Sequence, residues 1–214
     1  VRWPISTPPF STVISQRAAK PAMIGPRELS IALYGAWRFA TLDRSAIQFF
    51  DNTPEAFWRS FNAALLTLPA YALLVMLSFT QHPVEAGGLR ILFVESISYV
   101  IGWALFPLVM IAFTDTTKSA QNYFRFITAW NWSIVLQAFL FLGVSAFAAS
   151  GTVPDNLGGM ISLVATMAIF FYQGFIAKTT LDVTIPVAAM VVVIDLAIAI
   201  ALSLVSQSLY VTNA

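Results

Sequence analysis

Residues 183–206 read VTIPVAAMVVVIDLAIAIALSLVS, an apolar run with one acid, Asp195, near its middle. At ~1.5 Å of rise per residue this run forms a helix ~36 Å long, which is enough to cross a bilayer. Asp195 then lies ~18 Å from the start of the run, far from water on either side. A lone Asp at that depth costs roughly 2.5 to 3.5 kcal/mol on insertion scales, so neighbouring spans should supply a hydrogen-bond partner, a proton or a wet cavity. The run therefore predicts one span of a membrane bundle with a polar point inside it.

The composition of the whole chain agrees with a membrane location. Of the 214 residues, 58% are hydrophobic and only 10% are charged, and the mean hydropathy of +0.79 lies outside the usual range of soluble domains. Eleven Lys and Arg stand against ten Asp and Glu, so there is no basic excess to bind nucleic acid. The predicted partners are the lipid bilayer and other membrane proteins or further copies of the chain.

Motifs for catalysis or metal binding are missing from the sequence. It contains no Gly-rich phosphate loop, no nucleophile elbow and no His-Glu zinc helix. The absence of cysteine and the single histidine, His82, exclude disulfides, thiol chemistry and a His-rich metal or haem site. We therefore expect a protein that is not an enzyme and that has no catalytic residues, no cofactor and no metal.

The chain divides into three predicted parts. Residues 1–22, rich in Pro, Ser and Thr, predict a disordered tail, and Met23 is an alternative biological start. Residues 23–53 predict a cytoplasmic interfacial helix that opens at Gly25-Pro26, because polar positions recur at steps of three or four up to residue 50 and leave a broad apolar face. Residues 54–214 predict an all-α bundle of five membrane spans.

The five spans correspond to five apolar runs of about the length that a bilayer requires. They cover residues 61–80, 91–113, 126–149, 157–177 and 183–206. Ten of the eleven Lys and Arg precede the first run, separate the second from the third or follow the fourth, and Arg90 alone lies on the other side. The positive-inside rule therefore predicts a cytoplasmic N-terminus and a C-terminus outside.

Depth along the spans brings four polar side chains to similar levels. Gln137 lies ~17 Å into the third run, level with Asp195, so these two side chains could form a hydrogen bond across the bundle. Together with Asn131 and Gln173 they could line a polar pocket open to the cytoplasm. The alternative is that each side chain only forms an interhelical hydrogen bond, which stabilises the bundle by ~0.6 kcal/mol.

Other candidate positions lie near the ends of the spans. Glu95, ~6 Å inside the outer end of the second run, is a further polar pocket candidate, and its carboxylate could also reach water or pair with Arg90. Tryptophan is enriched where spans meet the headgroup region, which makes four tryptophans candidate interface anchors. They are Trp37, Trp58, Trp130 and Trp132.

An amphipathic segment ahead of five closely spaced spans resembles the Ypt-interacting-protein (Yip) family and its bacterial relatives. That family carries Asp-Leu-Tyr-Gly-Pro before the first span, and residues 32–36 here read Ala-Leu-Tyr-Gly-Ala, without the acid and the proline. The resemblance implies a scaffold or adaptor in a bacterial inner (cytoplasmic) membrane, with no cofactor.

Two other functions remain compatible with the sequence. One is a small-solute or proton-coupled transporter that uses Asp195, and the other is a subunit of a larger membrane complex. A water-filled cavity that reaches Asp195 would favour transport, whereas a dry, packed core would favour the scaffold.

Overall fold

The computed structural model describes residues 25–81, 86–152 and 154–210, and every regular element in these ranges is helical. Short elements come first: α2 (Pro26–Ala40), the 3-10 helix η1 (Arg44–Phe49) and α3 (Pro54–Ser60). Five long helices follow, with the 3-10 turn η2 (Ala120–Asn122) between the second and the third: α4 (Asn62–Gln81), α5 (Gly88–Thr116), α6 (Tyr123–Ala149), α7 (Asp155–Leu181) and α8 (Ile185–Tyr210). The tail predicted over residues 1–22 and the start at Met23 lie outside the described residues.

Five helices are long and apolar enough to cross a membrane, which confirms the all-α, five-span prediction. The last of them is longer than its apolar run. Although Gln207 and Ser208 are polar, α8 continues through them to Tyr210. This extra turn brings Tyr210 into the functional site described below.

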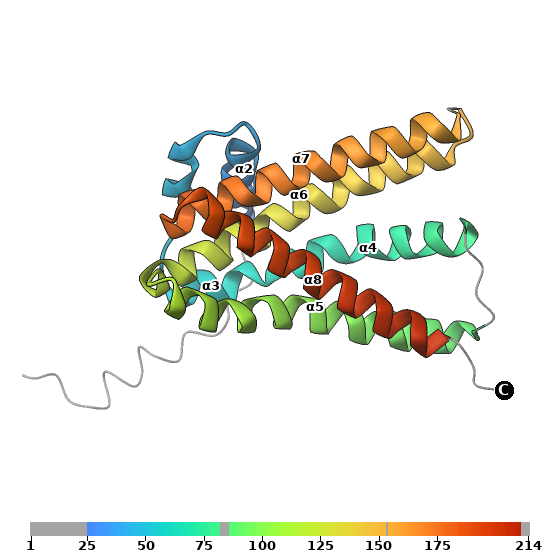
Figure 1. The fold of residues 1–214 in the computed structure, drawn as a ribbon, viewed down its shortest axis with the longest axis horizontal. Coiled ribbons are helices and arrows are strands. Elements are labelled where there is room, and N and C mark those ends of the chain that lie inside the picture. The colour runs from blue at the N-terminus through green and yellow to red at the C-terminus, as the bar shows by residue number, and fades with distance from the viewer. Residues whose placement is uncertain (1–24, 82–85, 153, 211–214) are drawn as a thin grey trace, which may run out of the picture.

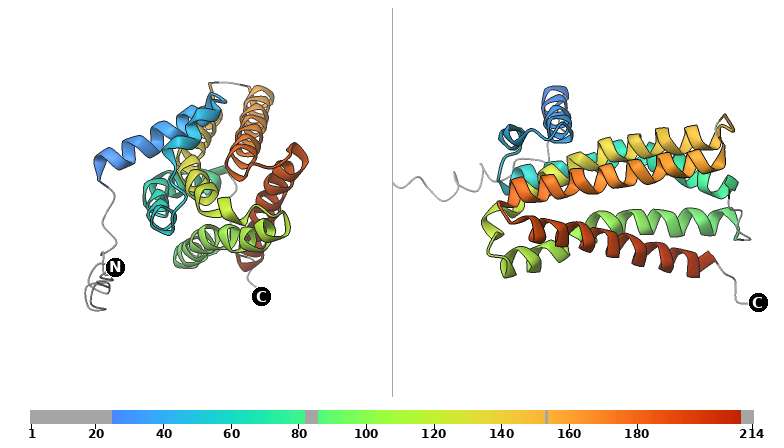
Figure 2. Two further views of the ribbon diagram at one scale, coloured as in Figure 1. Left: turned by 90° about the vertical axis from the view of Figure 1, so that its left-hand side faces the viewer. Right: turned by 45° about the horizontal axis from the view of Figure 1, so that its top comes forward.

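The long helices run side by side, and the short N-terminal elements lie at one end of the bundle (Figure 1). α6 packs against both α4 and α7, while α8 packs against α5 and α7. α4 and α5 are consecutive in the chain, yet their backbones seldom come close, and long side chains join them. The α6–α7 pair diverges from α5 and α8 toward the end of the bundle that is distant from α2 (Figures 1 and 2).

The tightest packing surrounds the first half of α6. Trp130 stacks on Phe106 of α5 with ring centroids 4.6 Å apart, and Phe126 contacts both rings. Trp130 and Trp132 are only 1% and 3% exposed, so the structure places them in the core instead of the lipid interface where the sequence analysis expected them. The physical reason is that α6 contacts neighbours on several sides. Trp37 and Trp58, which are 59% and 70% exposed, keep the exposure that an interface anchor requires.

The single interfacial helix expected within residues 23–53 is two elements, α2 and η1, in the structure. The chain leaves α2 through Leu42, whose φ of 59° lies in the left-handed region that a continuous helix cannot use. Asp43 then caps η1 by accepting a hydrogen bond of 2.8 Å from the backbone N–H of Ser45. The carboxylate of Asp43 also pairs with Arg38, so the break is held by side chains on both of its flanks.

The elements α2, η1 and α3, which we call the N-terminal layer, pack against α6 and α7 at one end of the bundle. Figure 2 (left) shows α2 on the α6 side of the bundle, away from α5 and α8. Gly35 allows close contact between α2 and η1, because a Cβ there would lie 2.8 Å from the Cβ of Phe49. The hydroxyl of Tyr172 on α7 donates to the carbonyl of Ala36 over 2.9 Å. The N-terminal layer is therefore packed onto the bundle through the buried face of α2.

Candidate functional site

Three of the polar side chains singled out in the sequence meet near the middle of the bundle. Nε2 of Gln173 donates to Oε1 of Gln137 over 3.1 Å and to Oδ2 of Asp195 over 3.0 Å. Gln137 in turn donates to the hydroxyl of Ser133 over 3.0 Å. Gln173 thus stands between Gln137 and Asp195, in place of the direct bond expected between them. We call Gln137, Gln173 and Asp195 the amide cluster.

The amide cluster contains one unusual atom. Gln173 is 5% exposed, and within the described part of the chain its Oε1 is a buried oxygen without a hydrogen-bond partner. Because both hydrogens of its Nε2 are already donated, the amide is fully used as a donor and unused as an acceptor. The cluster can therefore accept one further donor, such as a buried water molecule.

Asn131 lies apart from the amide cluster and has a different partner. Its Nδ2 donates to the hydroxyl of Ser60 over 2.9 Å, and that hydroxyl donates to the carbonyl of Phe57 over 2.7 Å. Asn131 therefore ties α6 to the end of α3. Its side chain also borders the cavity described next.

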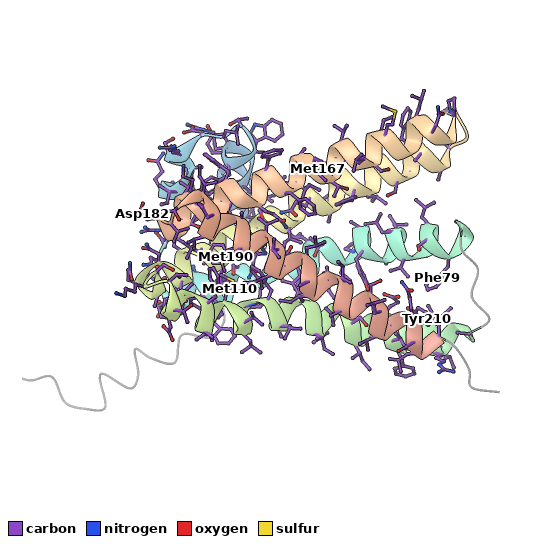
Figure 3. All side chains as sticks on the ribbon, viewed as in Figure 1. Phe79, Met110, Met167, Asp182, Met190 and Tyr210 are labelled. Atoms are coloured by element: carbon purple, nitrogen blue, oxygen red, sulfur yellow. The ribbon has the colours of Figure 1, made fainter. Side chains whose placement is uncertain are left out.

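A cavity of about 980 Å³ lies between α4, α5, α6 and α8, and we call it the central cavity. Asp195, Asn131 and Trp130 line its inner end. All the α8 residues that line it lie at Asp195 or beyond, so it extends from the middle of the bundle away from α2. Figure 3 shows Phe79 and Tyr210, which line its outer end, at the opposite end of the bundle from Asp182. Under the predicted topology the cavity therefore leads outward, whereas the sequence analysis expected a pocket open to the cytoplasm.

Glu95 is held at the outer end of the central cavity by two tyrosines. The hydroxyl of Tyr71 on α4 donates to one carboxylate oxygen, and the hydroxyl of Tyr210 on α8 donates to the other. One turn further in, Ser98 and Ser206 join α5 to α8 by a hydrogen bond of 2.8 Å. Glu95, which the sequence analysis named as a polar pocket candidate, thus links three helices at the cavity mouth.

Aromatic rings form the wall between the two acidic ends. The rings of Tyr71 and Tyr99 have centroids 4.7 Å apart, and Tyr99 lies 6.2 Å from Trp103. The hydroxyl of Tyr99 donates to the carbonyl of Ala64 over 2.5 Å, which fixes the ring between α4 and α5. These contacts hold the aromatic rings of the cavity wall in fixed orientations.

The lining of the central cavity is acidic at both ends. It includes the carboxyl groups of Asp195 and Glu95 and several hydroxyls, while among the lining residues that the structure describes none is Lys, Arg or His. Within the described ranges, no group of three or more His, Cys, Asp and Glu side chains could hold a metal ion. The cavity can thus offer negative charge, hydroxyl groups and aromatic surface to a ligand.

The tyrosines and serines of the central cavity were missed in the sequence, although two helical stripes point to them. Glu95, Tyr99 and Trp103 recur at steps of four, which places them on one face of α5. Polar residues at steps of three or four continue inside the last two turns of α8: Ser203, Ser206, Gln207 and Tyr210. Comparison of the chain with protein-family models, with curated proteins and with solved structures found no match.

Proposed function

We propose that this protein transports small solutes across a membrane and that the central cavity is its solute-binding site. The observation that carries the proposal is the reach of the cavity, from Asp195 midway along α8 to Glu95 and Tyr210 at one end of the bundle. Its volume of about 980 Å³ is near the upper end of small-molecule sites, which span roughly 300 to 1,000 Å³. Ionisable residues inside membrane bundles usually mark solute or proton pathways.

Asp195 is the residue that we expect to respond to the solute. Its carboxyl group is half-buried and borders the central cavity, while Gln173 holds one of its oxygens. A carboxyl group in this position can bind a solute directly or exchange a proton with it. The chain of amides and Ser133 behind it keeps the group oriented without supplying an opposing charge.

The opposite end of the bundle is closed by packed side chains. In the two turns of α8 that precede Asp195, the side chains of Ala188 and Val191 are buried. Met110 of α5 and Ile127 of α6 are buried as well. At this end of the bundle the N-terminal layer packs against α6 and α7. A cavity that reaches the middle of the bundle from one end and is closed at the other corresponds to one state of an alternating-access cycle. We place the protein in a bacterial inner membrane with the N-terminal layer in the cytoplasm.

A scaffold or adaptor of Yip-like architecture is the second candidate function, and the N-terminal layer favours it. Arg59 of α3 pairs with Glu28 of α2 over 3.0 Å, so the layer is held as one unit. Its outer surface presents Tyr34 and Trp37, both exposed aromatic side chains of α2. Such a surface suits a bilayer or a partner protein.

Cysteine labelling in membrane vesicles tests the transport proposal. The 214 residues contain no cysteine, so a single Ser203→Cys substitution gives a unique probe in the wall of the central cavity. Leu204→Cys is the matched control, since Leu204 lies at nearly the same depth and is exposed on the lipid side of α8. We expect a membrane-impermeant methanethiosulfonate reagent to modify the Ser203→Cys protein and not the Leu204→Cys protein. If the two folded variants are equally unreactive, the cavity is closed to water and the transport proposal is wrong.

A further inference from the structure

The charge of the central cavity selects among solutes. Asp195 lies at its inner end and Glu95 at its outer end, and the described lining contributes no basic side chain. A cavity with low-dielectric walls focuses the field of such groups, so it attracts cations and repels anions. The described partners of both carboxyl groups are neutral: the amide of Gln173, and the hydroxyls of Tyr71 and Tyr210.

The spacing of the oxygens argues against a metal ion as the solute. Metal ions such as Mg²⁺ and Ca²⁺ need about six or more oxygens within ~2.0 to 2.6 Å. Asp195 and Tyr210, by contrast, are separated along α8 by 15 residues, or ~22 Å. A single metal ion therefore cannot use both acidic ends of the cavity.

The aromatic wall supplies what an organic cation requires. Rings from four helices line the central cavity: Tyr71, Phe79, Tyr99, Trp103, Phe106, Trp130 and Tyr210. The faces of such rings attract ammonium-type cations, and their apolar surface accepts the substituents of these cations. Tyr71, Tyr99 and Trp103 follow one another in contact, so the attraction extends inward from Glu95.

We propose that the solute of the central cavity is an organic cation with apolar substituents, such as a quaternary ammonium or phosphonium ion. This inference rests on the proposed function and names the class of its substrate. Glu95 meets the cation at the mouth, the aromatic wall covers its substituents, and Asp195 pairs with its charge at the inner end.

A pair of probes of equal shape and opposite charge tests the inference. Purified full-length protein in detergent is titrated with tetraphenylphosphonium, and separately with tetraphenylborate, with binding followed by equilibrium dialysis. We expect saturable binding of the cation and no saturable binding of the anion. Asp195→Asn keeps the size of the side chain and removes its charge, so it should weaken cation binding by about tenfold or more. Glu28→Gln, in the N-terminal layer, should leave binding unchanged.

A second pair of variants locates the binding. Ala199 lines the central cavity and Ala201, two residues on, does not, so Ala199→Phe should abolish saturable cation binding while Ala201→Phe preserves it. Equal binding by both folded variants would show that the cation binds elsewhere and would overturn the inference.

The outcomes also separate this inference from the proposed function. If tetraphenylborate binds as tightly as the cation, or if neither probe binds while the Ser203→Cys protein remains reactive, the choice of organic cations is wrong and the solute cavity stands. If the probes do not bind and the Ser203→Cys protein is unreactive as well, both proposals are wrong.

Discussion

Gln173 of α7 holds Asp195 of α8 by a single hydrogen bond, with Nε2 and Oδ2 separated by 3.0 Å. The same nitrogen donates to Gln137 of α6, so the acid at mid-membrane depth is connected to two other helices by one amide. This arrangement replaces water as the partner of a polar group inside the bundle, as the depth of Asp195 requires. It leaves the carboxyl group at the wall of the central cavity, where it can still meet a solute.

Substitutions of Asp195 should separate its structural role from its charge. Asp195→Asn keeps an oxygen that can accept from Gln173, so we expect the stability of the bundle to remain close to that of the parent. Asp195→Leu removes the acceptor and should lower the free energy of unfolding by on the order of 1 kcal/mol. Unfolding in mixed detergent micelles measures both, with the lipid-facing Met190→Leu as control. A Leu variant as stable as the parent would show that the bond to Gln173 contributes nothing.

The contact of α2 with η1 predicts a strong effect at Gly35. A Cβ at this position would lie 2.8 Å from Phe49 and 2.9 Å from the ring of Phe50, so Gly35→Ala should push the two elements apart at a cost of ~1 to 3 kcal/mol. Gly143→Ala in α6 is the matched control, because nothing lies within 4 Å of its added Cβ. Thermal unfolding and limited proteolysis within residues 40–44 report the difference. Equal behaviour of the two variants would mean that the N-terminal layer is not packed as described.

The connection between α2 and η1 should depend on pH. Hydrogen bonds from Ser45, and then the paired Arg38 guanidinium, lower the pKa of Asp43 below its usual value. Because the pKa is lower in the folded protein than in the unfolded chain, this pairing stabilises the fold above about pH 4 and is lost as the pH falls further. Hydrogen exchange at the Ser45 amide, corrected for intrinsic rates, should accelerate below about pH 4 in the parent. Asp43→Asn should remove that transition, and an identical pH profile in the variant would contradict this assignment.

The distribution of basic residues predicts the topology. Alkaline phosphatase fused after Ala214 should be active, because the positive-inside rule places that end outside the cytoplasm. The same reporter fused after Lys118, between α5 and α6, should be inactive. Phosphatase activity confined to the Lys118 fusion would mean that the five spans run in the opposite direction.

The sequence predicted the number of spans, because length and hydropathy alone determine which segments enter a bilayer. It could not show that α6 is the central helix. All five spans are apolar around their whole circumference, so hydrophobic periodicity does not mark a buried face. Trp130 and Trp132 were expected at the interface because they lie near a span end, although they are packed inside the bundle.

The candidate site was predicted in part, for the residues whose polarity stands out in an apolar run. Counting depth placed Gln137 level with Asp195, and the structure brings both to Gln173. Tyr99 and Tyr210 were missed because tyrosine is common near the ends of membrane spans. Their hydroxyls find partners on other helices only because α4, α5 and α8 pack together. The direction of the central cavity likewise depends on how helices diverge, which no local pattern encodes.

Solute counterflow tests the central claim most directly. Proteoliposomes are loaded with unlabelled tetraethylammonium, an organic cation that crosses lipid slowly, and diluted into a trace of the radiolabelled ion. We predict a transient accumulation of label above that in protein-free liposomes, and its loss in a folded Asp195→Asn protein. Label that enters parent proteoliposomes no faster than protein-free liposomes would contradict the claim that the central cavity carries organic cations across the membrane.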